Sequence, residues 1–259
     1  MSKLVKFLLI FMFLIAFGLN ARGLEISWGP VPGYVTMNTL AGPTGYIMVP
    51  NAFTPSQFTL ALATGVMFSP FTYHPDIWVN YMPCQVNFAP FHIWEVGISK
   101  DFSFHDDASP HFVTDSTPFL IHTKLRVLRF NSGALAIGGM CDVVPDDSGA
   151  PSRGHSSFTF YSVVTGQTSL FGEFSVGIGK TFYFLHYPDF LINFYVGWLY
   201  SIKQLDDRLQ FAIDFTNADY RAGHWRFKVG TEARAIANAE IRGVIIKHKV
   251  IDWTIRTGI

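Results

Sequence analysis

Residues 174–184, which read FSVGIGKTFYF, alternate between bulky apolar side chains and small or polar ones. The apolar set is Phe174, Val176, Ile178, Phe182 and Phe184, and the other set is Ser175, Gly177, Gly179, Thr181 and Tyr183. Successive side chains of a β-strand point to opposite faces of its sheet. The pattern therefore predicts a strand with one apolar face and one small or polar face.

Segments 94–104 and 190–200 repeat this alternation, with Glu95 and Asp101 on the polar face of the first and Asn193 on that of the second. Segments of about ten residues with apolar side chains outward and polar ones inward are typical of transmembrane β-strands. A soluble lipocalin-like barrel is the alternative. The solvent-facing side of a soluble sheet should be polar, however, and these outward faces are apolar.

Turn signals divide the chain from residue 57 onward into segments of this kind. The predicted strands are 57–68, 76–88, 92–104, 118–130, 134–144, 157–166, 170–184, 189–201, 207–216, 224–235, 239–247 and 250–259. Long connections at 105–117, 145–156 and 217–223 broadly alternate with short ones at 89–91, 131–133, 167–169 and 236–238. We therefore predict an all-β fold, a transmembrane antiparallel up-and-down β-barrel of about 12 strands within a range of roughly 10–14. The strand parity places both chain ends on the short-turn rim.

The first residues predict an export signal. Lys3 and Lys6 precede an apolar run at 8–17, and the small residues within 18–23 suit cleavage. That run is shorter than the about 20 residues that a membrane-spanning helix needs, although an uncleaved anchor is the alternative. We predict a signal peptide over 1–22, a Gly/Pro-rich N-terminal segment over 23–56 and an outer-membrane β-barrel over 57–259.

Composition agrees with an exported barrel. Only 15% of the residues are charged, against about 25% in soluble domains, and 49% are hydrophobic. The 19 basic and 19 acidic residues balance, so no basic footprint for nucleic acid is present. Residues 251–259 form an amphipathic segment similar to the C-terminal signal that the barrel assembly machinery reads. The predicted partners are this machinery and outer-membrane lipid, and the predicted location is the outer membrane of a diderm bacterium.

Charged side chains of the predicted strands fall on the inward face, as expected because a charge facing lipid costs about 2–4 kcal/mol at mid-depth. This set is Glu95, Asp101, Lys124, Arg126, Glu173, Asp214, Arg226, Lys228, Glu232, Arg234, Arg242, Asp252 and Arg256. It predicts either a water-filled lumen with a charged constriction or a network of paired charges that fills the barrel. Three bases of the set, Arg226, Lys228 and Arg234, lie on one predicted strand and could favour anions in an open pore.

Other residues offer weaker candidates for chemistry. Cys84 and Cys141 predict either a disulfide, which an exported chain permits, or two thiols packed among apolar groups. His155 and Ser157 lie two residues apart, as in some outer-membrane lipid hydrolases, but no acidic partner is specified. The loop at 105–111 holds two His and two Asp without the spacing of a known metal site. We predict no metal, no cofactor and no enzymatic activity.

Residues 42–60 read GPTGYIMVPNAFTPSQFTL. This stretch resembles the motif that precedes the first strand of YjbH-like outer-membrane barrels, with Gly45, Pro50 and Ala52 at the motif positions. Residues 91–99, FHIWEVGIS, are similar to a turn-to-strand pattern of the same group. The resemblance implies a role in the production or export of exopolysaccharide, and therefore polysaccharide as a partner.

Three functions follow from these observations. The first is a non-enzymatic outer-membrane barrel that assists the export of surface polysaccharide or serves a structural role. The second is a small passive diffusion channel. The third is an outer-membrane lipid hydrolase that uses His155 and Ser157. All residue assignments depend on strand register, because a shift by one residue exchanges the two faces of a strand.

Overall fold

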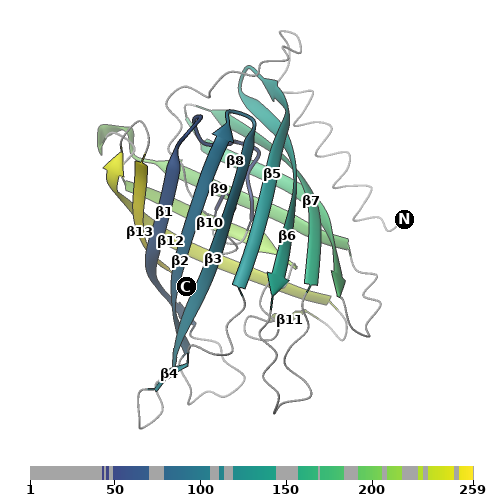
Figure 1. Cartoon of the computed structure of the whole chain (residues 1–259). Helices are drawn as coiled ribbons and strands as arrows, with labels where there is room; N and C mark the ends of the chain where they lie inside the picture. Colours follow the sequence, from purple (N-terminus) through teal and green to yellow (C-terminus); the bar gives the residue numbers. More distant parts are fainter. Residues whose placement is uncertain are drawn as a thin grey trace.

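The computed structural model describes residues 43, 45, 46, 49–69, 79–105, 111–113, 119–143, 157–168, 170–183, 192–205, 209–217, 227–229, 233–247 and 251–258. These residues form one β-sheet and contain no α-helix (Figure 1). None of the helical segments among them could cross a membrane. The predicted signal peptide lies outside the described residues.

The sheet contains thirteen strands among the described residues. They are β1 (Leu60–Ser69), β2 (Val79–Phe91), β3 (Trp94–His105), β4 (His111–Val113), β5 (Phe119–Phe130), β6 (Gly133–Val143), β7 (Ser157–Thr168), β8 (Gly172–Tyr183), β9 (Ile192–Ser201), β10 (Leu209–Thr216), β11 (Phe227–Val229), β12 (Ala233–Lys247) and β13 (Ile251–Gly258). A 3₁₀ turn, η1 (Lys203–Leu205), follows β9. The prediction of an all-β, antiparallel up-and-down fold is confirmed.

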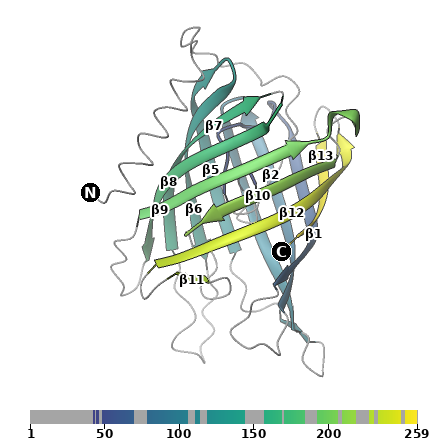
Figure 2. The same ribbon diagram turned by 180° about the vertical axis from the view of Figure 1, so that it is seen from behind.

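Each long strand pairs with the strands before and after it, and the sheet curves into two facing walls. Strands β13, β1, β2, β3, β5 and β6 lie on the side that faces the viewer in Figure 1, and β8, β9, β10 and β12 lie behind them (Figure 2). The short strand β4 pairs with β3, and the short strand β11 pairs with β12. Strand β12 pairs with β13 and also with β10, where Ile236–Gly243 lie opposite Leu209–Thr216.

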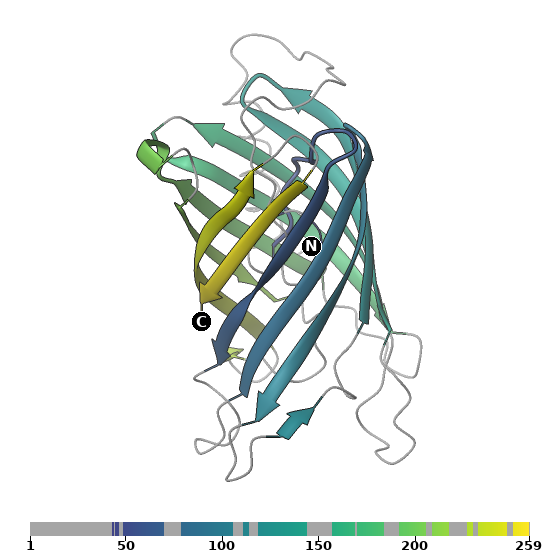
Figure 3. The same cartoon turned by 60° about the vertical axis from the view of Figure 1, so that its left-hand side comes forward.

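Strands β1 and β13 run parallel, whereas the other strand pairs are antiparallel (Figure 3). Apart from the three-residue strands β4 and β11, the sheet has eleven strands, counted from β1 to β13 inclusive, and successive strands alternate in direction. Because eleven is an odd number, the first and last of them point the same way. The start of β1 and the end of β13 therefore lie at opposite ends of the sheet. The prediction that both ends share one rim was wrong.

The position of the chain ends was predicted wrongly because the strands within residues 224–247 were divided incorrectly. Two strands, 224–235 and 239–247, were predicted there with a turn at 236–238. Instead β12 runs without a break over Ala233–Lys247, and β11 covers only Phe227–Val229. No Gly or Pro stands between residues 233 and 242 to reverse the chain, whereas Gly230 separates β11 from β12. The short strand β4 lies within a segment predicted as a loop.

The two faces of the sheet differ as the alternation predicted. Outward side chains are large, apolar and exposed, for example Phe160 at 58% and Ile213 at 51%. Inward side chains are mostly polar and buried, for example Glu95 and Lys124 at 0%. Val164 and Val176 are buried although they are not on the inward face. Apolar side chains outside and charged ones inside are the reverse of a soluble protein.

Candidate functional site

The segment that precedes β1 lies inside the curved sheet. We call residues 45, 46 and 49–54 the plug. It begins with a tight turn, in which Gly45 pairs with Pro50 and the Tyr46 N–H donates a 2.8 Å hydrogen bond to the Val49 carbonyl. Every residue of the plug is buried, and Tyr46 and Val49 have no exposed surface at all. The plug therefore occupies the interior between the two walls.

Backbone N–H groups of the plug donate to side chains of the wall. The Val49 N–H donates to Asp214 Oδ2 on β10 at 2.9 Å. The Ala52 N–H donates to Thr165 Oγ1 on β7 at 2.6 Å. A buried backbone donor needs a partner, because an unpaired one costs about 1–3 kcal/mol. Inward polar side chains on two well-separated strands thus supply partners that the plug lacks within itself.

Backbone carbonyls of the plug are bonded as well. The Arg242 guanidinium on β12 donates to the Gly45 carbonyl at 2.9 Å and to the Tyr46 carbonyl. The Tyr46 hydroxyl and Ser175 Oγ on β8 are 2.7 Å apart. One arginine therefore satisfies two acceptors of the turn, which suits its planar array of donors.

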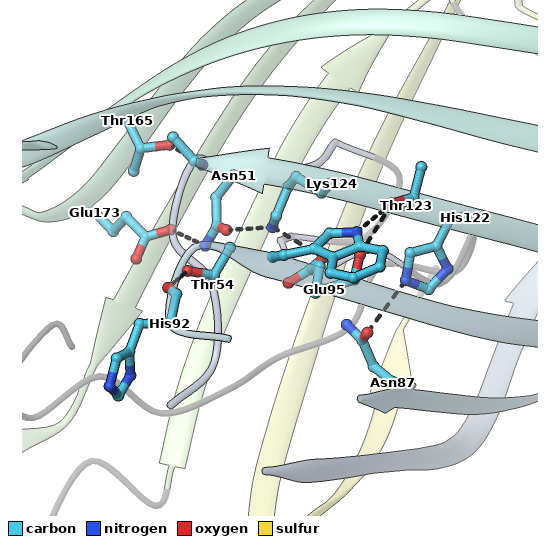
Figure 4. Close-up of polar contacts among 12 residues, drawn as sticks. Asn51, Thr54, Asn87, His92, Glu95, His122, Thr123, Lys124, Thr165 and Glu173 are labelled. Atoms are coloured by element: carbon cyan, nitrogen blue, oxygen red, sulfur yellow. Dashed lines mark hydrogen bonds and ion pairs between the residues drawn. The ribbon is translucent and has the colours of Figure 1, made fainter. Parts of the chain in front are cut away.

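Asn51 links the plug to charges on both walls (Figure 4). Its Nδ2 donates to Glu173 Oε1 on β8 at 2.7 Å, and its Oδ1 accepts from Lys124 Nζ on β5 at 3.4 Å. Lys124 Nζ also lies 3.1 Å from Glu95 Oε1 on β3. Both charged side chains of that pair are fully buried. The amide, with a donor end and an acceptor end, is complementary to an acid on one side and a base on the other.

The wall contains a second buried ion pair, on β12. Arg242 Nε lies 2.6 Å from Glu240 Oε1, and both side chains are at most 1% exposed. Positions two apart on a strand share a face, so this pair is built into one strand. Burial of a lone charge costs several kcal/mol, and both pairs therefore keep the interior near neutrality.

Large inward side chains lie across glycines of neighbouring strands. A Cβ added to Gly138 would lie 2.3 Å from the Tyr161 ring, and one added to Gly179 would lie 2.9 Å from the Tyr195 ring. The Tyr46 ring of the plug covers Gly197 in the same way, at 2.2 Å. Glycine is required at these positions because a methyl group would occupy the space of the ring.

His122 follows the same arrangement near the Glu95–Lys124 pair. Its ring lies over Gly97, and its Nε2 is 3.3 Å from Asn87 Oδ1 on β2 (Figure 4). The side chain therefore crosses β3 along the wall, from β5 to β2. Both His122 and Asn87 are buried.

A hydrogen-bonded junction joins the plug to β1. The Thr54 hydroxyl donates to the His92 carbonyl in the turn between β2 and β3, and the Gln57 N–H donates to His92 Nδ1 at 3.2 Å. Phe58 has a φ of 60°, an uncommon backbone conformation for a residue other than glycine. The chain turns there from the interior into the wall, where the Phe58 N–H bonds the Ala89 carbonyl.

The structure places six of the predicted inward residues together on the inward face, where each is buried. These residues are Glu95, Lys124, Arg126, Glu173, Asp214 and Arg242. The sequence did not single out Asn51, Tyr46 or Thr165 as their partners. A signal existed for Asn51, because it is a polar residue inside the Gly45–Ala52 stretch that carries the family resemblance and that now forms the plug.

The other predicted lumen residues are placed only by their backbone or not at all. Asp101 lies opposite Pro83, and Arg256 lies opposite Arg242. Lys228 on β11 lies opposite Arg234 on β12, so the prediction of a basic stripe along one strand was wrong. The side chains of Asp101, Lys228, Arg234, Asp252 and Arg256 lie outside the described residues, as do Arg226 and Glu232 entirely.

Cys84 on β2 and Cys141 on β6 form no disulfide. Strands β3 and β5 lie between them, and three strand spacings of about 4.8 Å exceed the Cα separation of about 7 Å that a bridge tolerates. Of the two predicted alternatives for these cysteines, the structure therefore supports two separate thiols and not the disulfide.

The hydrolase and metal candidates fall mainly outside the described residues. His155 is among the residues left out, and Ser157 is described only by its backbone at the start of β7. Where the structure gives side chains, no group of three or more His, Cys, Asp or Glu is arranged to hold a metal ion. The loop candidates Asp106 and Asp107 lie outside that part of the chain.

Comparison with known proteins gives no assignment. No protein-family model, curated protein or solved structure matches the chain. Two features of the molecule distinguish it, the reversed polarity of the sheet and the plug that occupies its interior.

Proposed function

We propose that the chain is a non-enzymatic outer-membrane β-barrel protein whose interior is closed by its own plug. The observation that carries this proposal is the reversed polarity of the sheet. Ile98, Ile121 and Ile137 on neighbouring strands are each exposed by 42–47% on the outward face. Charged groups such as Glu95 and Lys124 are fully buried on the inward face. Water would penalise that outward surface, whereas hydrocarbon would not.

A closed barrel is the form in which this sheet could be stable in a membrane. An open sheet edge leaves backbone N–H and C=O groups unpaired, and each costs several kcal/mol in lipid. The pairing of β12 with both β10 and β13, and of β13 with β1, supports closure because no long strand then has a bare edge. The proposed barrel has eleven long strands, with β1 and β13 as its parallel seam.

Barrel size supports a plugged interior. About eight strands enclose a space that their own side chains fill, whereas about 16–18 leave an aqueous channel. Eleven strands fall between these cases, so side chains of the wall alone would leave a gap along the axis. The plug fills that space and bonds to β5, β7, β8, β10 and β12. This favours a closed barrel over a passive channel.

The resemblance to YjbH-like barrels adds the biological role. The motif residues Gly45, Pro50 and Ala52 all belong to the plug, so the resemblance falls on the part of the chain that closes the interior. We assign the protein an accessory or structural role in the passage of surface polysaccharide. Its partners are outer-membrane lipid, the barrel assembly machinery and the polysaccharide itself.

The first test is cell fractionation followed by gel mobility of boiled and unboiled outer-membrane samples. We expect outer-membrane location and a mobility shift on heating, which reports a closed barrel. The variant Ile121→Lys should reduce the folded fraction, because a charge on the lipid face costs about 2–4 kcal/mol. A protein recovered in the soluble fraction without a mobility shift would contradict the proposal.

A passive channel is the second candidate, because the inward face is polar. Purified barrel in planar bilayers should show little conductance in potassium chloride if the plug seals it. Steady wild-type conductance would favour the channel. Deletion of the gene should alter surface polysaccharide if the accessory role is correct, and unchanged polysaccharide would leave only the structural role.

A further inference from the structure

We propose that the plug is a displaceable gate, and that the interior it occupies is a latent pore for small hydrated ions and polar solutes. This inference rests on the proposed barrel but goes beyond it, since a permanently sealed barrel would satisfy everything stated above. Three properties of the described residues carry it: how the plug is attached, what remains paired without it, and where large side chains lie.

The plug is not part of the sheet. Within the described residues, its β-bridge joins Gly45 to Pro50 inside the plug itself, and none of the strand ladders includes it. The bonds described between plug and wall are individual hydrogen bonds that each involve at least one side chain, such as those from the Val49 and Ala52 N–H groups to Asp214 and Thr165. Departure of the plug would therefore break no strand pairing.

The wall keeps its own ion pairs when the plug leaves. Lys124 pairs with Glu95 on the adjacent strand, and Arg242 pairs with Glu240 on the same strand. Neither pair uses a plug residue. Glu173 and Asp214 would exchange their bonds with the plug for bonds with entering water, which makes a hydrogen-bond exchange of small net cost. The Lys124–Glu95 and Arg242–Glu240 pairs would therefore both stay intact.

Three large inward rings lie over glycines of the wall. Tyr161, Tyr195 and His122 lie along the wall over Gly138, Gly179 and Gly97 instead of projecting across the interior. These ring-to-glycine contacts lie within the wall and use no plug residue, so they should persist without the plug. The space vacated by Tyr46, Val49 and Ala52 would then be lined by polar and charged groups of both signs.

The first experiment weakens the attachment of the plug. Thr165→Val and Asp214→Ala together remove both side-chain acceptors of its backbone N–H groups. We expect the open probability in planar bilayers with potassium chloride to rise by about ten-fold or more over wild type. The matched control is Thr123→Val, the same substitution on the outward face of β5, which should leave conductance unchanged.

The second experiment locks the plug reversibly. In a Cys84→Ser, Cys141→Ser background, Ala52→Cys and Thr165→Cys place thiols on two neighbouring residues of plug and wall, which the 2.6 Å hydrogen bond from the Ala52 N–H to Thr165 Oγ1 now joins. Oxidation should hold the barrel silent, and reduction should restore openings. The control lock joins native Cys141 to Ile121→Cys, a directly opposite pair on the outward face, in a Cys84→Ser background. Its oxidation should not alter conductance.

The outcomes separate the gate from the barrel. The gate would be refuted if the weakened variants conduct no more than wild type and the locked variant carries equal currents when oxidised and reduced. If these variants keep the heat-dependent mobility shift, the barrel itself is still supported. Loss of the mobility shift in wild type would instead refute the barrel itself. Conductance that rises on weakening, and disappears only with the plug-to-wall lock, establishes the gate.

Discussion

The Asn51 amide of the plug donates a 2.7 Å hydrogen bond to the Glu173 carboxylate, although 122 residues separate them in the chain. The same side chain accepts from Lys124 on the facing wall. A single amide therefore connects an acid and a base that belong to β8 and β5. These two partners fix the orientation of the Asn51 amide. If the amide were rotated by 180°, its oxygen would face the Glu173 carboxylate and its NH₂ group would face the Lys124 ammonium.

Asn51→Asp should destabilise the folded protein. The substitution replaces the donor with a second carboxylate beside Glu173, in a buried site where unmatched charge is costly. We expect a loss of about 1–3 kcal/mol, measured as a lower urea concentration for loss of the fast-migrating gel band. Adding Glu173→Gln restores a donor opposite the new acceptor and should recover most of the loss. Equal stability of Asn51→Asp and wild type would show that this contact contributes nothing.

Lys124→Met should be among the most damaging single changes in the wall. It leaves the fully buried Glu95 carboxylate without its base, and breaking a buried pair in this way costs about 3–5 kcal/mol. The double variant Glu95→Gln, Lys124→Met removes both charges and should be closer to wild type. A double-mutant cycle on folded fraction measures the difference. Strictly additive effects would argue against a direct pair.

Gly197→Ala should move the plug. A Cβ at this position would lie 2.2 Å from the Tyr46 ring, so the ring must shift and carry the turn with it. We expect destabilisation of about 1–3 kcal/mol, typical of overpacking, together with faster proteolysis within residues 45–54. Tyr46→Val should relieve the clash in the double variant. If the Gly197→Ala variant were as stable as wild type, the Tyr46 ring could not lie over residue 197.

The two thiols should stay separate under oxidation. Boiled samples should migrate identically with and without reductant, and alkylation of unfolded protein without prior reduction should label Cys84 and Cys141 both. The reason is geometric, because β3 and β5 lie between their strands. A mass lower by two hydrogens, with no labelling, would indicate a bridge and a different strand order.

Sequence alternation predicted the wall well because each strand carries its own evidence. The polarity at Glu95 or Asp214 follows from the immediate neighbours in the chain, and both side chains are buried as that parity requires. The long strand β12 was missed because Ala235–Ala239 combine small and polar residues, which resemble a turn in composition. Continuous pairing with β10 shows that tertiary contacts decided its conformation.

The plug could not be predicted in the same way. Its residues have no periodicity, and its partners lie far along the chain, as Val49 and Asp214 do at a separation of 165 residues. Local patterns contain no information on such pairs. What the sequence did provide was a surplus of inward polar groups without a stated partner, and the backbone of the plug proves to be one of their main partners.

In the proposed outer-membrane barrel, the parallel pairing of β1 with β13 has a consequence for where the two chain ends lie. In a barrel with an even number of strands, both ends of the chain lie on the same side of the membrane. Here β13 runs beside β1 in the same direction, from the rim of short turns toward the rim of long connections. If short turns face the periplasm, as in outer-membrane barrels generally, an epitope fused after β13 becomes accessible to antibody on intact cells.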